Sequence, residues 1–322
     1  MRQSRRNWIC YRAVVLLVVH MLTRAGTSQT PSPAATCEST VKGLLEIVPL
    51  TSKVYSNTRN LRVWLPPGYN DTANAKRTYP VLYLFDGQML FDRCTAPGQI
   101  AEWRVDETLT DLITKHSIDP IIVVGIDNAG RNRTHEFSPY PNPLLPPDDA
   151  GLAGDKVPDF LATDVLPFVA AHYRIAGGRE HTGIGGSSLG AVAALYALLH
   201  RPDLFALGLL ESTALQLGNG QLIRDTSPIL RAPLRVTIGV GTEELEPDVC
   251  KMLGVPEFNS GFVKLSQRLA DNFRAALFNH PDVKLTIEPG AHHSAQFWGE
   301  RFVAAVQFLY PPATPEIPAG KQ

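Results

Sequence analysis

The stretch HTGIGGSSLGAVAALYALLHRPDLF, residues 181–205, decides the fold of this chain. A run that suits a strand, His181 to Gly185, leads into Gly186-Ser187-Ser188-Leu189-Gly190, which reads G-x-S-x-G. Good helix formers follow at once, from Ala191 to Leu199. Strand, sharp turn and helix form the context in which a serine projects from a nucleophile elbow. We therefore predict that Ser188 lies at the N-terminus of a helix, where free N–H groups favour negative charge. The alternative is a glycine-rich turn without a catalytic role.

Apolar segments on both sides of this turn alternate between strand-like and helix-like patterns. The strand-like segments are 43–50, 61–66, 81–85, 121–126, 181–185, 204–212, 234–241 and 283–290, and the helix-like ones are 105–116, 158–173, 191–199, 263–277 and 295–310. The runs VLYLF and IIVVGI are continuously apolar, as expected of strands buried on both faces. We therefore predict an α/β fold with a mostly parallel central sheet of about eight strands, helices on both faces and no large lid. The first two strands should be antiparallel, and the 158–173 helix should kink near Pro167.

The connection 127–157 is long, contains several prolines and has no helical period. Long loops in compact domains are usually functional or disordered. This one follows a core strand, so we expect it at the carboxyl edge of the sheet, the edge that also carries Ser188 and where ligands bind in such folds.

Residues 1–26 carry the pattern of a secretory signal peptide. Arg2, Arg5 and Arg6 precede the apolar core AVVLLVVHML (13–22), and small residues follow it. The core is too short for a comfortable membrane span, so we expect cleavage and a secreted or periplasmic protein without stable membrane insertion; the alternative is an uncleaved anchor. We assign 27–40 to a flexible lead-in, 41–311 to a catalytic α/β domain, and 312–322 to a flexible tail.

Composition and cysteine usage narrow the class of protein. The chain is 44% hydrophobic with a formal net charge of −1, which suits a globular enzyme and speaks against nucleic-acid binding. No C-x-x-C pair or His/Cys cluster suggests a metal site. After loss of Cys10 with the signal, Cys37, Cys94 and Cys250 remain. We predict a Cys94–Cys250 disulfide and a free Cys37, because the loops of Cys94 and Cys250 should leave the same edge of the sheet.

A serine nucleophile needs a base, and in elbow-type hydrolases the chain order is serine, acid, histidine. His292 and His293 follow the last strand, at the edge of the elbow, so one of them is the expected base. The acid should follow the preceding strand, where the candidates are Glu243, Glu244, Glu246 and Asp248.

Two backbone amides should hold the oxyanion that forms during acyl transfer. The residue after the nucleophile, Leu189, supplies the first, and the loop FDGQMLFD (85–92) after the third strand supplies the second, near Gln88. Asp86 follows the wrong strand for the triad acid, so we interpret it as a structural anchor of that loop.

The chain resembles the "putative esterase" group of α/β-hydrolases, which includes enterochelin-type esterases, S-formylglutathione hydrolases, feruloyl esterases and mycolyltransferases. The resemblance runs from about Tyr79 to Tyr310 and rests on the segments YPVLYLFDGQMLFD, WRVDETLTDLI, IIVVGIDNAGRNRTHEFSPY, YRIAGGREHTGIGGSSLGA and GAHHSAQFWGERFVAAVQFLY. It implies a serine esterase without metal or organic cofactor.

The resemblance also implies roles for single residues. The family's nucleophile falls on Ser188, its acid on Glu244 and its oxyanion loop on Gly87 and Gln88. Its histidine, with a tryptophan five positions on, falls on His293, so that the triad is Ser188, His293 and Glu244.

The sequence and the resemblance together indicate a secreted serine esterase for small-molecule esters. The alternatives are an acyltransferase, a peptidase and a non-catalytic binding protein of the same fold. Substrate-lining candidates, each equally suited to core or rim packing, are Met89, Trp103, Tyr140 and Trp298. Arg131 and Arg133 are expected either to meet an anionic substrate or to be solvated.

Overall fold

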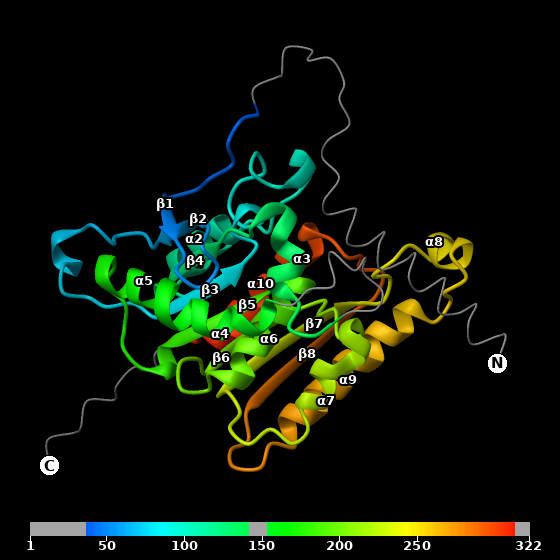
Figure 1. The fold of residues 1–322 in the computed structure, drawn as a ribbon. Coiled ribbons are helices and arrows are strands. Elements are labelled where there is room, and N and C mark those ends of the chain that lie inside the picture. Colours follow the sequence, from blue (N-terminus) through cyan, green and yellow to red (C-terminus); the bar gives the residue numbers. More distant parts are fainter. Residues whose placement is uncertain (1–36, 142–152, 313–322) are drawn as a thin grey trace, which may run out of the picture.

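A computed structural model describes residues 37–141 and 153–312, and its framework is an eight-stranded sheet (Figure 1). The strand order is β1-β2-β4-β3-β5-β6-β7-β8. β2 pairs antiparallel with β1 and β4, and all pairs from β4 to β8 are parallel. The strands are β1 (Leu44–Thr51), β2 (Thr58–Leu65), β3 (Val81–Phe85), β4 (Ile122–Ile126), β5 (Thr182–Ser187), β6 (Leu207–Glu211), β7 (Arg235–Gly241) and β8 (Asp282–Glu288). The predicted sheet is confirmed.

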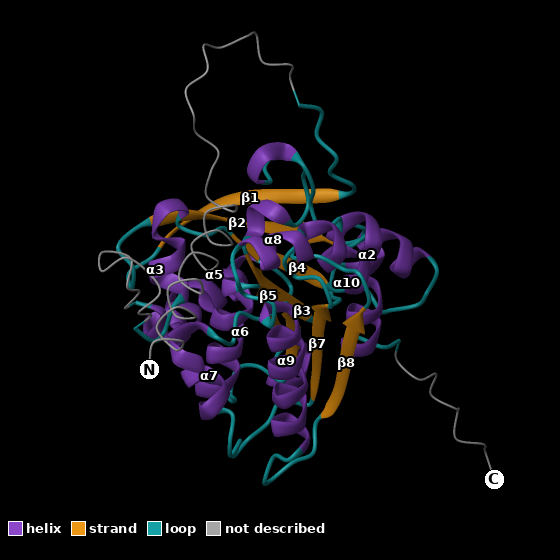
Figure 2. Ribbon diagram, turned by 90° about the vertical axis from the view of Figure 1, so that its right-hand side faces the viewer, coloured by secondary structure: helices purple, strands orange, loops and turns teal. Residues whose placement is uncertain are grey.

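Helices cover both faces of the sheet (Figures 1 and 2). On one face lie α4 (Val157–Phe160), α5 (Leu166–His172), α6 (Leu189–His200) and α9 (Phe258–Arg274), and on the other α2 (Val105–Thr114) and α10 (Ala295–Leu309). The central strands are buried on both sides because their side chains alternate between two cores. In β3, Tyr83 and Phe85 pack with the first group of helices, and Leu82 and Leu84 with the second.

The helix expected at 158–173 is irregular near its proline, as predicted. Between α4 and α5, residues Leu161–Val165 form a π-helical turn, and Pro167 is the second residue of α5. Because α4, this turn and α5 follow one another without a break, the proline lacks the N–H that would bond to the preceding turn, and the Leu166 amide bonds to the Leu161 carbonyl in the π-helical pattern. The buried Asp164 in the turn accepts hydrogen bonds from the Ser52 hydroxyl at 2.7 Å and the Lys53 amide at 3.0 Å.

Several short helices at the carboxyl edge were not predicted. The expectation of no helix in 127–157 is wrong for α3 (Arg133–Phe137), although residues 142–152 lie outside the described part. Two more are α7 (Gln221–Asp225) and α8 (Pro247–Met252). These helices are too short to show a 3.6-residue period and are held by tertiary contacts. The described residues contain no large lid over the edge.

The predicted Cys94–Cys250 disulfide is wrong. Cys94 pairs with Cys37, at a Cα–Cα distance of 5.6 Å, and Cys250 is a buried free thiol. Cys250 packs in α8 within an apolar cluster that includes Val240 and Phe258. The Cys94 loop follows β3 and the Cys250 loop follows β7, and β5 and β6 separate these strands. At about 4.8 Å per strand, the two loops are too far apart to be bridged.

The segment around Cys37 is tied to the body of the protein, although we assigned residues up to 40 to a flexible lead-in. The Ser39 hydroxyl donates to Asp92 at 2.9 Å, and the Thr40 hydroxyl donates to Glu102 at 2.6 Å. The proposed signal peptide lies outside the described residues. Within the ranges 37–141 and 153–312, no helix is long and apolar enough to cross a membrane.

Non-reducing peptide mapping is expected to recover one linked pair of peptides, containing Cys37 and Cys94. Cys250 should react with an alkylating reagent only after unfolding, since its side chain is buried. A linked pair that contains Cys250 in the native protein would contradict this assignment.

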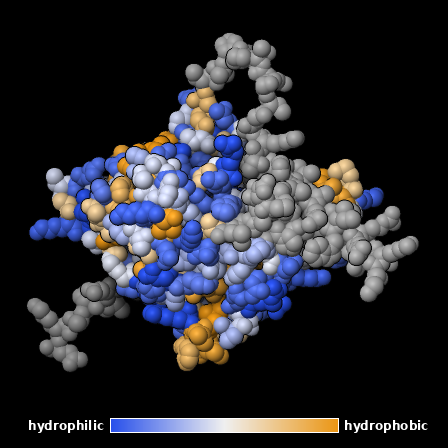
Figure 3. All heavy atoms as spheres, in the orientation of Figure 1, coloured by the Kyte–Doolittle hydropathy of each residue, from blue (hydrophilic) through white to orange (hydrophobic). Residues whose placement is uncertain are grey.

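Hydrophobic residues gather on the surface at the lower end of Figure 3, where Figure 1 places the connection between α9 and β8. Leu277 and Phe278 in that connection are 58% and 80% exposed, and Leu230 and Leu234 ahead of β7 are 60% and 44% exposed. These residues precede parallel strands, so they lie at the amino edge of the sheet. This patch is therefore separate from the carboxyl edge that carries Ser188.

Candidate active site

Ser188 occupies a strained turn between β5 and α6. It follows Ser187, the last residue of β5, and precedes Leu189, the first residue of α6, with φ 54° and ψ −120°. A non-glycine residue in this region of φ and ψ is costly and persists where the surroundings enforce it. The strand and helix meet closely here, since a Cβ atom at Gly186 would lie 2.8 Å from the Gly190 carbonyl carbon. The turn has the geometry expected of a nucleophile elbow.

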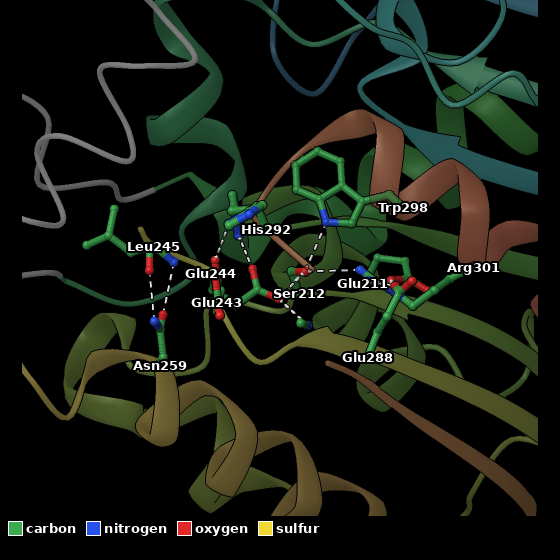
Figure 4. Close-up of polar contacts among 12 residues, drawn as sticks. Glu211, Ser212, Glu243, Glu244, Leu245, Asn259, Glu288, His292, Trp298 and Arg301 are labelled. Carbon is green, nitrogen blue, oxygen red and sulfur yellow. Dashed lines mark hydrogen bonds and ion pairs between the residues drawn. The ribbon is translucent and has the colours of Figure 1, made fainter. Parts of the chain in front are cut away.

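Of the two adjacent histidines, only His293 is paired with a buried carboxylate. Its Nδ1 lies 2.6 Å from Glu244 Oε2, and the two side chains are 8% and 0% exposed. His292 Nδ1 instead lies 2.9 Å from the Glu243 carbonyl oxygen, with its side chain 34% exposed (Figure 4). The other acidic candidates, Glu246 among them, do not bond to His293. The structure therefore brings Glu244 and His293 together, as the resemblance implies.

The second oxygen of Glu244 also has two donors. Oε1 accepts from the Gly241 amide and the Ser212 hydroxyl, each at 2.7 Å. Burial favours the neutral acid, but the hydrogen bond and charge of His293, together with these donors, outweigh it and hold the pKa of Glu244 below its ordinary value. Glu244 is thus a carboxylate that faces the imidazole.

The loops of the acid and the histidine pack directly against each other. A Cβ atom at Gly241, where β7 ends, would lie only 2.0 Å from the carbonyl oxygen of Ala291, so glycine is required there. The residue after the acid is fixed by α9, since Asn259 exchanges hydrogen bonds of 2.9 and 2.8 Å with the backbone of Leu245 (Figure 4). These contacts hold the Glu244–His293 pair at the carboxyl edge.

The far nitrogen of the histidine is available. His293 Nε2 is buried and has no hydrogen-bond partner among the described residues, so the structure places no bond between it and Ser188. Catalytic hydrogen bonds are often long in free enzymes and shorten when substrate binds. An imidazole that donates from Nδ1 to a carboxylate presents an acceptor at Nε2.

The proposed oxyanion residues lie beside the elbow. β3 and β5 are neighbours, with Leu84 opposite Gly185, so Gly87 and Gln88 emerge at about the level of Leu189. Leu189 begins α6, and its backbone N–H is therefore one of the helix's unpaired first donors. Gly87–Met89 form a short 3₁₀ turn after β3. The placement suits two amides that point to one oxygen, and the role itself stays a prediction.

Asp86 anchors this loop, as the sequence analysis expects. Its carboxylate accepts hydrogen bonds of 2.6 and 2.7 Å from Arg133 and one of 2.7 Å from the Asn128 side chain. Arg133 is only 7% exposed, so neither expectation for it holds: it binds Asp86 in place of an anionic substrate or solvent. Arg131, by contrast, is exposed.

The substrate-lining candidates separate into core and rim. Trp103 and Trp298 are 2% and 1% exposed and pack in the core with Met89, which is one of the two placements that the sequence leaves open for them. Tyr140 is half-buried and borders a small pocket with Leu189. Tryptophan occurs both in protein cores and at pocket rims, so the residue type alone does not show which of the two positions a tryptophan occupies.

A buried polar cluster behind the acid was missed by the sequence analysis. The Trp298 indole donates to Ser212 Oγ at 2.9 Å, and Arg301 donates to Glu211 and Glu288, each at 2.7 Å (Figure 4). Burial raises the pKa of Glu211 to about 7, although Arg301 opposes the shift. Two features of the sequence could have indicated this cluster. Glu211 ends an apolar strand, and Arg301 lies on the apolar face of the last helix.

The ranges 37–141 and 153–312 contain no cluster of three or more histidine, cysteine, aspartate or glutamate residues suited to a metal ion.

Comparisons with known proteins agree with this geometry. Residues 52–309 match the model of the family described as "Putative esterase". The chain is 22% identical over 258 residues to the uncharacterized protein YbbA of Bacillus subtilis, a match that covers 79% of this chain and 94% of YbbA.

Solved structures with the same fold include esterases. The siderophore hydrolase EstB from Aspergillus nidulans superposes with a TM-score of 0.64 at 18% identity, over 87% of this chain and 96% of EstB. An IroE-like serine hydrolase from Shewanella oneidensis gives a TM-score of 0.65 at 20% identity, over 83% and 80% of the two chains. The family match spans most of the chain and contains the elbow, the acid and the histidine, and the chain therefore belongs to the "Putative esterase" family of α/β-hydrolases and is a carboxylic ester hydrolase.

Proposed function

We propose that this protein is a secreted serine esterase that hydrolyses small-molecule carboxylic esters through an acyl-enzyme, with Ser188, His293 and Glu244 as its triad. The observation that carries the proposal is the buried 2.6 Å contact between His293 and Glu244, with the free Nε2 at the sheet edge where the strained Ser188 turn lies.

In the first half-reaction, Ser188 Oγ forms a bond to the acyl carbon while its proton passes to His293 Nε2. The Leu189 and Gln88 amides hold the resulting oxyanion. Glu244 orients the imidazole and stabilises the imidazolium. The intermediate collapses, the ester C–O bond breaks, and His293 gives its proton to the leaving alcohol.

In the second half-reaction, water attacks the acyl-enzyme. His293 takes a proton from the water and returns it to Ser188 Oγ as the carboxylic acid leaves. The chemistry needs no metal or organic cofactor. An acyltransferase differs only in that an alcohol replaces water in this step, so product analysis with an added alcohol separates the two activities.

Export is part of the proposal. The apolar segment 13–22 has the pattern of a cleavable signal, and the Cys37–Cys94 disulfide suits an oxidising compartment. The N-terminal residue of the exported protein tests this: a start beyond residue 22 supports cleavage, and retention of the apolar segment contradicts it.

We expect short acyl and aryl esters in solution to react faster than emulsified long-chain triglycerides. The pocket beside Leu189, bordered by Val192, Leu217 and Tyr140, has a free volume of about 10 Å³. That is room for about one water molecule, and the described residues contain no large lid that could shelter a long acyl chain. The measurement is a series of p-nitrophenyl esters of increasing acyl length beside a triglyceride emulsion. Absence of ester hydrolysis would refute the proposed function, and a marked preference for the emulsion would contradict the expected substrate size.

A further inference from the structure

We propose that Ser212 is a positioning residue that fixes the carboxylate of Glu244, and that Trp298 sets the direction in which the Ser212 hydroxyl donates. This inference rests on the proposed function, because it assigns Ser212 a role through the Glu244–His293 pair. Neither the elbow motif nor the triad order calls for a serine at this position.

The topology puts Ser212 between the nucleophile and the acid. β6 lies between β5 and β7 in the sheet. Ser188 follows β5, Ser212 follows β6, and Glu244 comes after β7. Parallel strands end at the same edge of a sheet, so the residue that follows the middle strand β6 lies beside the acid. That residue is Ser212, and it bonds to Glu244.

The hydrogen bonds around Ser212 Oγ allow only one orientation of its proton. The Trp298 indole N–H, at 2.9 Å, can only donate, and so can the Arg301 guanidinium, which lies 3.5 Å from the same oxygen. Both therefore occupy lone pairs of Ser212 Oγ. Its single proton then points to Glu244 Oε1, 2.7 Å away. The result is a directed chain from Trp298 through Ser212 to the carboxylate.

Trp298 contacts His293 directly and reaches Glu244 through Ser212. Its ring packs against His293 edge to face, with 5.0 Å between ring centroids. Its N–H donates to Ser212 (Figure 4). The Trp298 side chain is 1% exposed, so these contacts are shielded from bulk water. A hydrogen bond to a charged group is stronger in such surroundings than in water.

The backbone at Ser212 has a conformation that is unfavourable for serine. Its φ of 44° lies in the left-handed region, which glycine adopts more easily than serine. Glycine would relieve the strain and lose the hydroxyl. The substitution Ser212→Gly therefore separates the contribution of the hydroxyl from that of the backbone.

The experiment compares Ser212→Gly and Ser212→Ala with the wild-type enzyme on a soluble aryl ester. Without the hydroxyl, Glu244 Oε1 keeps only the Gly241 amide as donor and the carboxylate is held less firmly against His293, so kcat is expected to fall by about 10- to 100-fold. KM should change by less than about twofold, because the imidazolium that Glu244 stabilises forms only in the transition state.

The pH profile supplies a readout that a merely structural role would not move. A carboxylate with one donor fewer is more basic, so the coupled Glu244–His293 pair should hold its proton to higher pH. The acid limb of kcat/KM should then shift to higher pH in both variants. The variants leave the other charged groups around the pair unchanged, so these groups do not cause the shift. They are Arg301 of α10, Glu211 of β6 and Glu288 of β8, together with His292 and Glu246 on the exposed side.

A double-mutant cycle tests the directed chain. Trp298→Phe keeps an aromatic ring but removes the N–H, and should lower kcat by itself. Combined with Ser212→Ala, it should cost much less than the product of the two single effects, because the N–H acts through the Ser212 oxygen. The matched control is Thr237→Val, which removes a hydroxyl that is 3% exposed on the neighbouring β7 and should leave kcat and the pH profile unchanged.

The outcomes separate this inference from the proposed function. If the wild-type enzyme hydrolyses the ester and its Ser188 reacts with a fluorophosphonate, but the Ser212 variants keep wild-type kcat and acid limb, the inference about Ser212 fails alone. Multiplicative effects of Ser212→Ala and Trp298→Phe would also overturn it. If the wild-type enzyme shows neither hydrolysis nor labelling, the proposed function is wrong, and the inference about Ser212, which rests on it, is wrong as well.

Discussion

Replacing Ser188 with alanine is expected to abolish ester hydrolysis and to leave the fold intact. The hydroxyl is the atom that bonds to the acyl carbon, and no other group in the proposed mechanism can take its place. Loss of a catalytic serine lowers kcat on the order of 10⁴-fold or more. The backbone at this position already has φ 54°, and alanine meets the same constraint as serine, so the thermal midpoint should change little.

The neighbouring serine provides the matched control. Ser187 is 3% exposed and ends β5, so Ser187→Ala changes one hydroxyl next to the nucleophile without touching the reaction. Its activity should stay close to that of the wild-type enzyme. An inactive Ser187→Ala beside an active Ser188→Ala would show that the elbow is misplaced by one residue.

The second large effect is expected at His293. His293→Gln removes the base and the buried partner of Glu244, and should lower kcat by about 10³- to 10⁶-fold, the remainder coming from binding and the oxyanion amides. His292→Gln should remain within about tenfold of the wild-type rate, because His292 contacts the Glu243 carbonyl and has its side chain one-third exposed. Steady-state kinetics of the two variants on one aryl ester make the comparison.

The reverse order would overturn the assignment of the base. If His292→Gln loses more activity than His293→Gln, the imidazole that serves Ser188 is the exposed one, and the buried pair has a structural role. Circular dichroism of both variants guards against loss of fold as the cause.

The fold could be predicted because its signals are local. The β3 and β4 runs are apolar at every position and the segment 181–205 combines strand, turn and helix, so the sheet and the elbow follow from short windows. The acid and the base were narrowed to two loops by chain order, and the resemblance selected Glu244 and His293 from neighbours of the same type.

What the sequence did not show depends on distances between strands. The predicted Cys94–Cys250 pair requires neighbouring strands, and the sheet order, which separates β3 from β7, is not visible in any window. Cys37 lay in a segment that we expected to be flexible, so its partner was missed.

The buried polar cluster was invisible for a related reason. Ser212 is an ordinary residue at the end of an apolar run, and Arg301 is one charge on an amphipathic helix. Each acquires its meaning only through residues far along the chain: Ser212 through Glu244 and Trp298, and Arg301 through Glu211. Trp298 suited core and rim packing equally well in the sequence, and its hydrogen bond to Ser212 places it in this cluster.

The central claim is that Ser188 carries the acyl group during turnover, and trapping that intermediate tests it most directly. The protein is mixed with an activated aryl ester whose acyl-enzyme hydrolyses slowly, quenched in acid, and analysed by mass spectrometry before and after digestion. The account predicts a mass increase of one acyl group on the peptide that contains Ser188, absent from Ser188→Ala and discharged from the wild-type protein by longer incubation. An acyl group found on another residue, or rapid ester hydrolysis by Ser188→Ala, would contradict it.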